Sequence, residues 1–237
     1  MPMNVGVLRA GAHTGRRLDL TQILGPATVR SRWRVYAGAL PAAALIALAI
    51  WFLQLAAFPF VTEISPMQFG PHFWPHRVAL LAHLGGGTVA LLVGPWQLWS
   101  GLGSFRMHQH RWTGRVYVLA VLVGGSAAFY LSAHTEGLAK AMSLQALGVA
   151  WWTTTWMAYR AIRAGRELQH KKWAARSYAV TFAFVTFRFG VIAGVLSHLG
   201  SAPVPVLLWL SWTIPLLITE LALRFRARPT VKLPAAS

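Results

Sequence analysis

The stretch Val78–Trp99, VALLAHLGGGTVALLVGPWQLW, contains no Asp, Glu, Lys or Arg. At 1.5 Å per residue, a helix of this length spans roughly 30 Å, the thickness of the hydrocarbon core of a bilayer. Its apolar residues follow one another without a regular alternation with polar ones, which favours a helix over a barrel strand. The stretch therefore predicts a transmembrane helix.

Five further apolar runs lie on either side of this stretch. In chain order, the six predicted spans are Val35–Phe58, Val78–Trp99, Val116–Ala133, Ala141–Tyr159, Ser177–Ser197 and Pro203–Leu223. Only two of them contain a charged residue, Arg188 in the fifth and Glu220 in the sixth. We therefore expect an all-α polytopic membrane bundle of about six transmembrane helices, in which spans two to five form a four-helix core.

The composition of the whole chain agrees with a membrane location. Of the 237 residues, 56% are hydrophobic and 11% are charged, and the mean hydropathy is +0.50. A soluble domain of this length would have roughly 25% charged residues. The chain has no Cys, which excludes disulfides, thiolate metal sites and a cysteine nucleophile.

Basic residues are concentrated on one side of the predicted membrane domain. Of the 22 Lys and Arg residues, 19 precede the first span, follow the sixth, or lie between spans two and three or four and five. Arg77 and Lys140 lie on the other side. Because basic loops stay in the cytoplasm, we expect a bacterial inner-membrane protein with both termini cytoplasmic. The net charge of +17 indicates topology and not a nucleic-acid partner.

The same pattern divides the chain into three parts and implies the lipid bilayer as its partner. They are a basic cytoplasmic tail at 1–34, a six-span membrane domain at 35–223 and a second basic cytoplasmic tail at 224–237. The only sizeable external loop is predicted at 59–77, where His72 and His76 are expected to be solvated.

A short motif occurs twice, once before span three and once around the start of span five. Residues 109–117 read QHRWTGRVY, and residues 169–178 read QHKKWAARSY. Aligned on Trp112 and Trp173, the copies are 61 residues apart, and the second has one extra residue between His and Trp. Parallel repeats about an axis along the membrane normal would give this pattern. They would bring His110 and His170 to equal depth at the cytoplasmic face.

Two interpretations of this motif remain open. In the first, His110 and His170 are the axial ligands of a b-type haem held between facing helices. Residues that would support the haem, the arginines by neutralising its propionates, are Arg115, Arg176, Tyr117 and Tyr178. In the second, both motifs are interfacial anchors, in which basic groups meet lipid phosphates and aromatic rings lie at the headgroups.

Polar residues inside the spans are a second candidate site. A charge in hydrocarbon costs at least about 2.5–3.5 kcal/mol, and residues such as Arg188 are therefore expected to have a functional role. Arg188 and His83 are expected roughly 13 Å and 8 Å from the outer surface, close enough to share a layer that binds an anion, a quinone carbonyl or a haem propionate. Glu220, near the inner end of its span, is expected to pair with Arg176 or Arg115. A second haem would need a partner for His83, and the shallower His134 and His198 are the candidates.

The stretch from His83 to Glu220 contains several short motifs. They are His83-Leu84-Gly85-Gly86, Gly94-Pro95-Trp96-Gln97, the two histidine motifs, Val180-Thr181-Phe182 through Thr186-Phe187-Arg188, and Trp209-x-x-Trp212 through Glu220. Together they resemble the uncharacterised bacterial membrane proteins grouped as domain of unknown function 2306. This chain departs from that pattern at Ala174, where the family usually has Met, and at His134–Gly137, which argues against His134 as a ligand throughout the family.

The family brings no established activity with it. Its layout is similar to cytochrome b561-type bundles, in which paired histidines on a four-helix core hold haem, an analogy of architecture alone. Three functions therefore remain: a b-haem redox protein that passes electrons from a quinone or cytoplasmic donor to an outer acceptor, a small-solute or proton-coupled transporter that uses Arg188 and His83, and a structural or assembly subunit.

Overall fold

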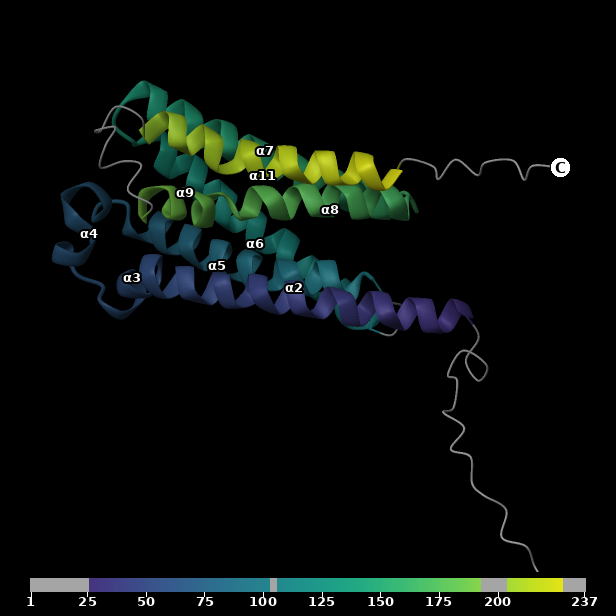
Figure 1. Ribbon diagram of the computed structural model, residues 1–237. Helices are drawn as coiled ribbons and strands as arrows, with labels where there is room; N and C mark the ends of the chain where they lie inside the picture. Colours follow the sequence, from purple (N-terminus) through teal and green to yellow (C-terminus); the bar gives the residue numbers. More distant parts are fainter. Residues whose placement is uncertain (1–25, 103–105, 193–203, 228–237) are drawn as a thin grey trace, which may run out of the picture.

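The computed structural model describes residues 26–102, 106–192 and 204–227, and all regular elements within these ranges are helices. In chain order, they are α2 (Pro26–Ala56), α3 (Phe58–Thr62), α4 (Pro66–Phe73), α5 (Arg77–Ser100), α6 (Met107–Ala133), α7 (Leu138–Arg163), α8 (Glu167–Thr181), α9 (Ala183–Ile192) and α11 (Val204–Ala227). The long helices lie side by side along one direction (Figure 1). The predicted all-α membrane bundle is confirmed.

Four segments of the described chain are long and apolar enough to cross a bilayer. They are Ala37–Ala56, Arg77–Ser100, Met107–Ala133 and Val204–Phe225. The fourth predicted span lies in α7, which has 26 residues but contains the run WWTTTW and further Ser and Gln residues that lower its hydropathy. The fifth is divided between α8 and α9, and its last residues, together with His198, lie outside the described ranges.

Several helices begin well before the apolar runs that predict them. The third span was expected from Val116, yet α6 begins at Met107, and α8 begins at Glu167, ahead of Ser177. The α2 helix likewise begins at Pro26, inside the predicted tail 1–34, and α11 continues to Ala227. Hydropathy marks only the part of a helix that lies in hydrocarbon, whereas the polar ends continue into the headgroup region. The rest of both predicted tails lies outside the described residues.

The α8 and α9 helices continue each other across Phe182 (Figure 1). The Phe182 amide donates to the carbonyl of Tyr178 at 3.0 Å, and the Thr186 amide donates to the carbonyl of Phe182 at 3.1 Å. The Thr181 hydroxyl donates back to the Ser177 carbonyl at 2.9 Å. Such back-bonding by Ser or Thr bends helices, which explains a local break in an otherwise continuous rod.

The predicted external loop 59–77 contains two short helices. The Ser65 hydroxyl caps α4 by accepting from the Gln68 amide at 3.2 Å, and Pro66 occupies the first turn. Both residues favour a helix start at this point. The α3 and α4 helices lie at the end of the bundle opposite the beginning of α2 and the end of α11 (Figure 1). The two ends of the described chain therefore leave the bundle on the same side.

The four-helix core closes into a ring. The α5 helix packs on α6, α6 on α7, α7 on α8, and α8 on α5, so that α6 and α8 lie diagonally across the ring. The α2 helix adds to the outside against α5, and α11 adds against α7, α8 and α9. The core was expected from spans two to five, and the structure has this arrangement.

The contact between α5 and α6 is made by backbone. A Cβ atom on Gly86 would lie 2.6 Å from the Ala120 carbonyl oxygen and 2.7 Å from the Gly124 nitrogen. Small residues at a crossing of two membrane helices permit this close approach. Because lipid tails are as apolar as the side chains, van der Waals packing and not the hydrophobic effect then holds the helices together. Gly86 of α5 and Gly124 of α6 therefore set the distance between the two helices.

Gly86 and Gly87 offer a matched test of this contact. A Cβ on Gly87 has nothing within 4 Å. We expect Gly86→Ala to destabilise the detergent-purified protein by about 1–3 kcal/mol, because neither helix backbone can yield to the added methyl group. Gly87→Ala should change stability by less than about 0.5 kcal/mol. Thermal melting followed by fluorescence-detected size exclusion measures both, and equal melting temperatures for the two variants would contradict the contact.

Candidate functional site

The two histidines of the repeated motif occupy equivalent positions. His110 is the fourth residue of α6, and His170 is the fourth residue of α8. The amide of each donates at 2.9 Å to the carbonyl of the residue that precedes the helix, Arg106 or Arg166. The two imidazoles meet inside the four-helix core, with ring centroids 6.3 Å apart and ring planes at 89°. The structure thus brings together two residues that are 60 positions apart.

Both rings are held through Nδ1. The His170 Nδ1–H donates to the carbonyl of Ala158 on α7 at 3.0 Å. The His110 Nδ1 lies 2.9 Å from the hydroxyl of Ser100, which is itself 3.4 Å from the Gln97 carbonyl. When Ser100 donates to that carbonyl, its oxygen accepts from His110. In both rings Nε2 then keeps its lone pair, as in histidines that bind metals.

Small residues border the histidine pair. A Cβ on Gly101 would lie 3.4 Å from Cε1 of His110, and Ser100 and Ala158 supply the Nδ1 partners. Ala158 and Ser100 are both buried. The groups of α5 and α7 that hold the two imidazoles are thus a serine hydroxyl and a backbone carbonyl.

A layer of buried hydroxyls lies two turns deeper in the bundle. The Tyr117 hydroxyl is 2.9 Å from the Ser177 hydroxyl and 2.7 Å from the Thr181 hydroxyl. Thr155 on α7 reaches Ser177 at 2.7 Å, and the Trp151 indole donates to Thr181 at 2.8 Å. Polar groups buried away from water need such partners. The layer links α6, α7 and α8 directly beneath the histidines.

Arg115 and Tyr178, predicted to support a cofactor, make other contacts. The Arg115 guanidinium lies over the Trp112 ring of its own helix at 5.5 Å. The Tyr178 hydroxyl donates to the Leu91 carbonyl on α5 at 3.2 Å, and its ring fills the space left by Gly94. A Cβ on Gly94 would lie 2.1 Å from that ring. Neither residue has a described contact with the histidine pair.

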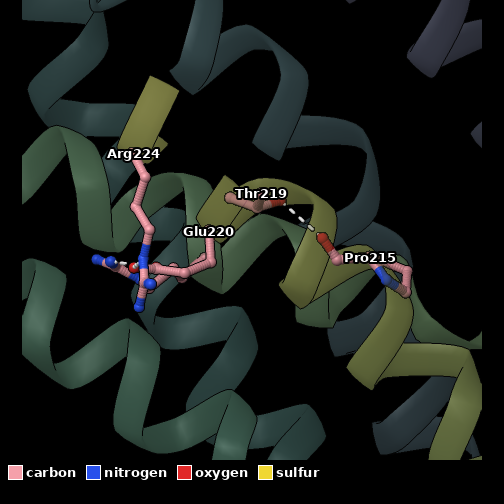
Figure 2. Close-up of polar contacts among 5 residues, drawn as sticks. Pro215, Thr219, Glu220 and Arg224 are labelled. Atoms are coloured by element: carbon pink, nitrogen blue, oxygen red, sulfur yellow. Dashed lines mark hydrogen bonds and ion pairs between the residues drawn. The ribbon is translucent and has the colours of Figure 1, made fainter. Parts of the chain in front are cut away.

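Glu220 pairs with Arg176, one of the two predicted partners. The Arg176 Nε–H donates to Oε2 at 3.0 Å, and Nη2 of the same guanidinium contacts this oxygen too. Arg224 reaches Oε1 from the same helix at 3.2 Å (Figure 2). The Arg176 guanidinium also lies 4.7 Å from the Trp173 ring centroid. An open hollow of about 430 Å³ between α7, α8 and α11 borders this ion pair.

His83 and Arg188 do not meet in the described structure. The His83 Nδ1–H donates to the Gly124 carbonyl on α6 at 3.0 Å, where α5 and α6 approach most closely. Its ring faces Phe184 on α9, with centroids 6.0 Å apart. Phe184 lies one turn before Arg188 on the same helix.

A group of histidines at the end of the bundle that holds α3 and α4 was not predicted. His76 and His134 have ring centroids 4.5 Å apart, and Tyr130 contacts both. The expectation that His76 is simply solvated is wrong, because it is half-buried against these rings. A signal was present in the sequence. His76 precedes span two and His134 follows span three, so an antiparallel pair of spans places both at one end.

Larger metal-binding groups are not formed within the described ranges. No three or more His, Cys, Asp or Glu side chains there come together in an arrangement that could hold a metal ion. The described histidine contacts lie at both ends of the core, His110 with His170 at the end where α2 begins and His76 with His134 at the opposite end.

The comparisons with known proteins give one match. A family model described as "Predicted membrane protein (DUF2306)" matches residues 80–223. No curated protein and no solved structure matches the chain. The matched region begins after His76 and includes both inner histidines, the hydroxyl layer, His134 and Glu220. It covers more than half of the chain, and the chain therefore belongs to this family of predicted membrane proteins.

Proposed function

We propose that the protein is a membrane electron-transfer protein that holds one b-type haem between His110 and His170. The observation that carries this proposal is the ring pair itself. Two imidazoles from diagonally opposed helices face each other, and the Nδ1 of each is already engaged. Histidines on facing helices of a bundle are a common way to hold a cofactor in its core.

The spacing of the rings supports the same proposal. Two metal–nitrogen bonds of about 2 Å, added to the distance from each Nε2 to its ring centre, give a centroid separation of roughly 6 Å. The observed separation is 6.3 Å. His110 and His170 would then each supply one ring nitrogen to the iron of a bound haem. The donor set therefore fits bis-histidine ligation.

The space around the pair sets a condition on the proposal. The two hollows at the surface of the bundle are lined by other residues, among them Arg176 and Glu220 in one and Arg160 and Gln169 in the other. A macrocycle between the histidines therefore needs the side chains around the pair to rearrange, while the separation of the two rings stays as it is. The small residues Ser100, Gly101 and Ala158 reduce what must be displaced.

The surrounding residues have defined tasks in this arrangement. Ser100 and the Ala158 carbonyl orient the two imidazoles, as outer hydrogen-bond partners of metal-binding histidines do. The hydroxyl layer of Tyr117, Ser177 and Thr181 closes the site toward the membrane interior. A bound haem would exchange single electrons with a quinone or a cytoplasmic donor on one side and with an outer acceptor on the other.

Absorption spectroscopy tests the haem. Protein purified in detergent from haem-replete cells should show a Soret band that shifts on dithionite reduction, at one haem per chain. His110→Ala and His170→Ala should each lower the haem content at least tenfold, because each removes an axial ligand. His108→Ala is the matched control, since this exposed residue lies on the same turn and has no contact with the pair.

A colourless wild-type protein that elutes as a single folded species would overturn the haem proposal. So would full haem retention in both histidine variants. Size exclusion and far-UV circular dichroism show that each variant is folded, which separates loss of ligand from loss of structure.

The transporter alternative has less support. It relies on a polar pathway that contains both His83 and Arg188, but the His83 imidazole is bonded to Gly124 and faces Phe184. The hollow beside Arg176 and Glu220 lies between α7, α8 and α11, and His83 is not one of its lining residues.

We further propose that both termini face the cytoplasm of a bacterium and that the membrane is the inner one. The charge asymmetry supports this orientation: of the 22 basic residues, 19 belong to the side that carries the termini. The described helices agree, since the beginning of α2 and the end of α11 lie at one end of the bundle (Figure 1).

The cysteine-free chain allows a direct test of orientation. Glu136→Cys lies in the exposed turn after α6, and Leu168→Cys lies at the exposed start of α8. A membrane-impermeant maleimide should label position 136 in intact spheroplasts and position 168 only after permeabilisation, because the reagent reaches only the outer face. Labelling of 168 but not 136 in intact spheroplasts would show the inverted topology.

A further inference from the structure

The outer end of the α5–α6 pair holds a second cluster of imidazoles. It consists of His76, Tyr130 and His134, with His72 on α4 at 6.5 Å between ring centroids from His76. His76 immediately precedes α5, and His134 immediately follows α6. These residues lie at the end opposite the His110–His170 pair and take no part in the proposed haem site.

A single residue holds both rings of this cluster. The His134 Nδ1–H donates to the backbone carbonyl of Tyr130 at 2.8 Å, which leaves the His134 Nε2 with its lone pair. The His76 Nδ1 lies 3.0 Å from the Tyr130 hydroxyl. Outer partners of this kind fix the ring orientation of metal-binding histidines. Tyr130 thus orients one imidazole with its main chain and the other with its side chain.

The spacing of the rings suits neighbouring ligands on one metal. With metal–nitrogen bonds of about 2 Å and an angle near 90–110° at the metal, two imidazole centroids lie roughly 4.5–5 Å apart. The centroids of His76 and His134 are 4.5 Å apart, with planes tilted by 43°. This value matches the lower end, which corresponds to the right angle of square-planar Cu²⁺ geometry.

The composition of the cluster selects the class of metal. Imidazole nitrogens bind borderline transition metals, and for a given nitrogen site the affinity rises to Cu²⁺ and falls again at Zn²⁺. Carboxylates do not add to it, since no larger His, Cys, Asp or Glu group forms among the described residues. Tyr130 is 46% exposed and His134 is exposed too, so solvent has access to the cluster and water can complete the coordination.

We infer that His76 and His134 form a surface site for one Cu²⁺ ion at the outer end of the bundle, with Tyr130 as the residue that positions both ligands. The site is a feature of this chain beyond the family match, because His76 precedes the matched residues 80–223.

Copper titration of the full chain tests the site. Protein purified in detergent without a polyhistidine tag is titrated with Cu²⁺ buffered by glycine and followed by calorimetry and by electron paramagnetic resonance. We expect one Cu²⁺ per chain at this site, with hyperfine coupling from two imidazole nitrogens. His76→Ala and His134→Ala should each weaken binding at least tenfold, and Zn²⁺ and Ni²⁺ should bind more weakly than Cu²⁺.

Two controls make the result specific. His108→Ala should bind Cu²⁺ like the wild type, since this exposed residue lies at the other end of the bundle. Tyr130→Phe keeps both imidazoles and removes only the hydroxyl, so it should weaken binding about tenfold. Unchanged Cu²⁺ affinity in both His76→Ala and His134→Ala would overturn the site, and unchanged affinity in Tyr130→Phe would overturn the positioning role. Neither outcome depends on whether haem binds at the inner end.

Discussion

The backbone contact of α5 and α6 at Gly86 and Gly124 is the constraint on which the His76–His134 pair and the Ser100–His110 contact depend. It fixes these two antiparallel helices at a distance that no side chain could allow. At one end the contact brings the residue before α5 against the residue after α6, so that His76 meets His134. At the other end it places Ser100, the last residue of α5, beside His110 in the first turn of α6. A shift of either helix along its axis would separate His76 from His134 and Ser100 from His110.

Polar contacts connect three helices in the interior of the core. In hydrocarbon, a hydroxyl or an indole N–H gains nothing from water and must find its partner within the protein. Tyr117, Thr155, Ser177 and Thr181 satisfy one another across three helices, and Trp151 donates to the same group. The layer also explains why α7 is less hydropathic than its neighbours: it directs Ser and Thr inward, where the partners lie.

The fold was largely predictable because its physical basis is simple. Continuous apolar runs identify membrane helices, and the positions of Arg and Lys indicate how the helices alternate. The repeated motif predicted that His110 and His170 lie at one depth, and the ion pair of Glu220 with Arg176 followed from their shared position near the inner face. In each case, axial position along a helix was enough.

The sequence did not predict the contact partners of several side chains, because these depend on the direction in which each side chain leaves its helix. The partners of His83, Arg115 and Tyr178 are decided by rotation about the helix axis, and periodicity is weak where lipid and core are both apolar. The outer histidines were missed for another reason. A loop that appears solvated in sequence is drawn back onto the bundle by two short helices, and Ser65 and Pro66 start the second of them.

The extra residue in the second copy of the motif has a consequence for the history of the chain. In an α-helix one residue corresponds to a turn of about 100° as well as a rise, so an insertion redirects every side chain that follows it. Tyr178, the counterpart of Tyr117 in the aligned motifs, therefore faces α5 and Leu91, while Ser177 takes the place opposite Tyr117. A duplicated hairpin would begin with two interchangeable halves. After this single insertion the two tyrosines have different contacts. Tyr117 bonds to the buried hydroxyls of α8, whereas Tyr178 connects α8 to α5.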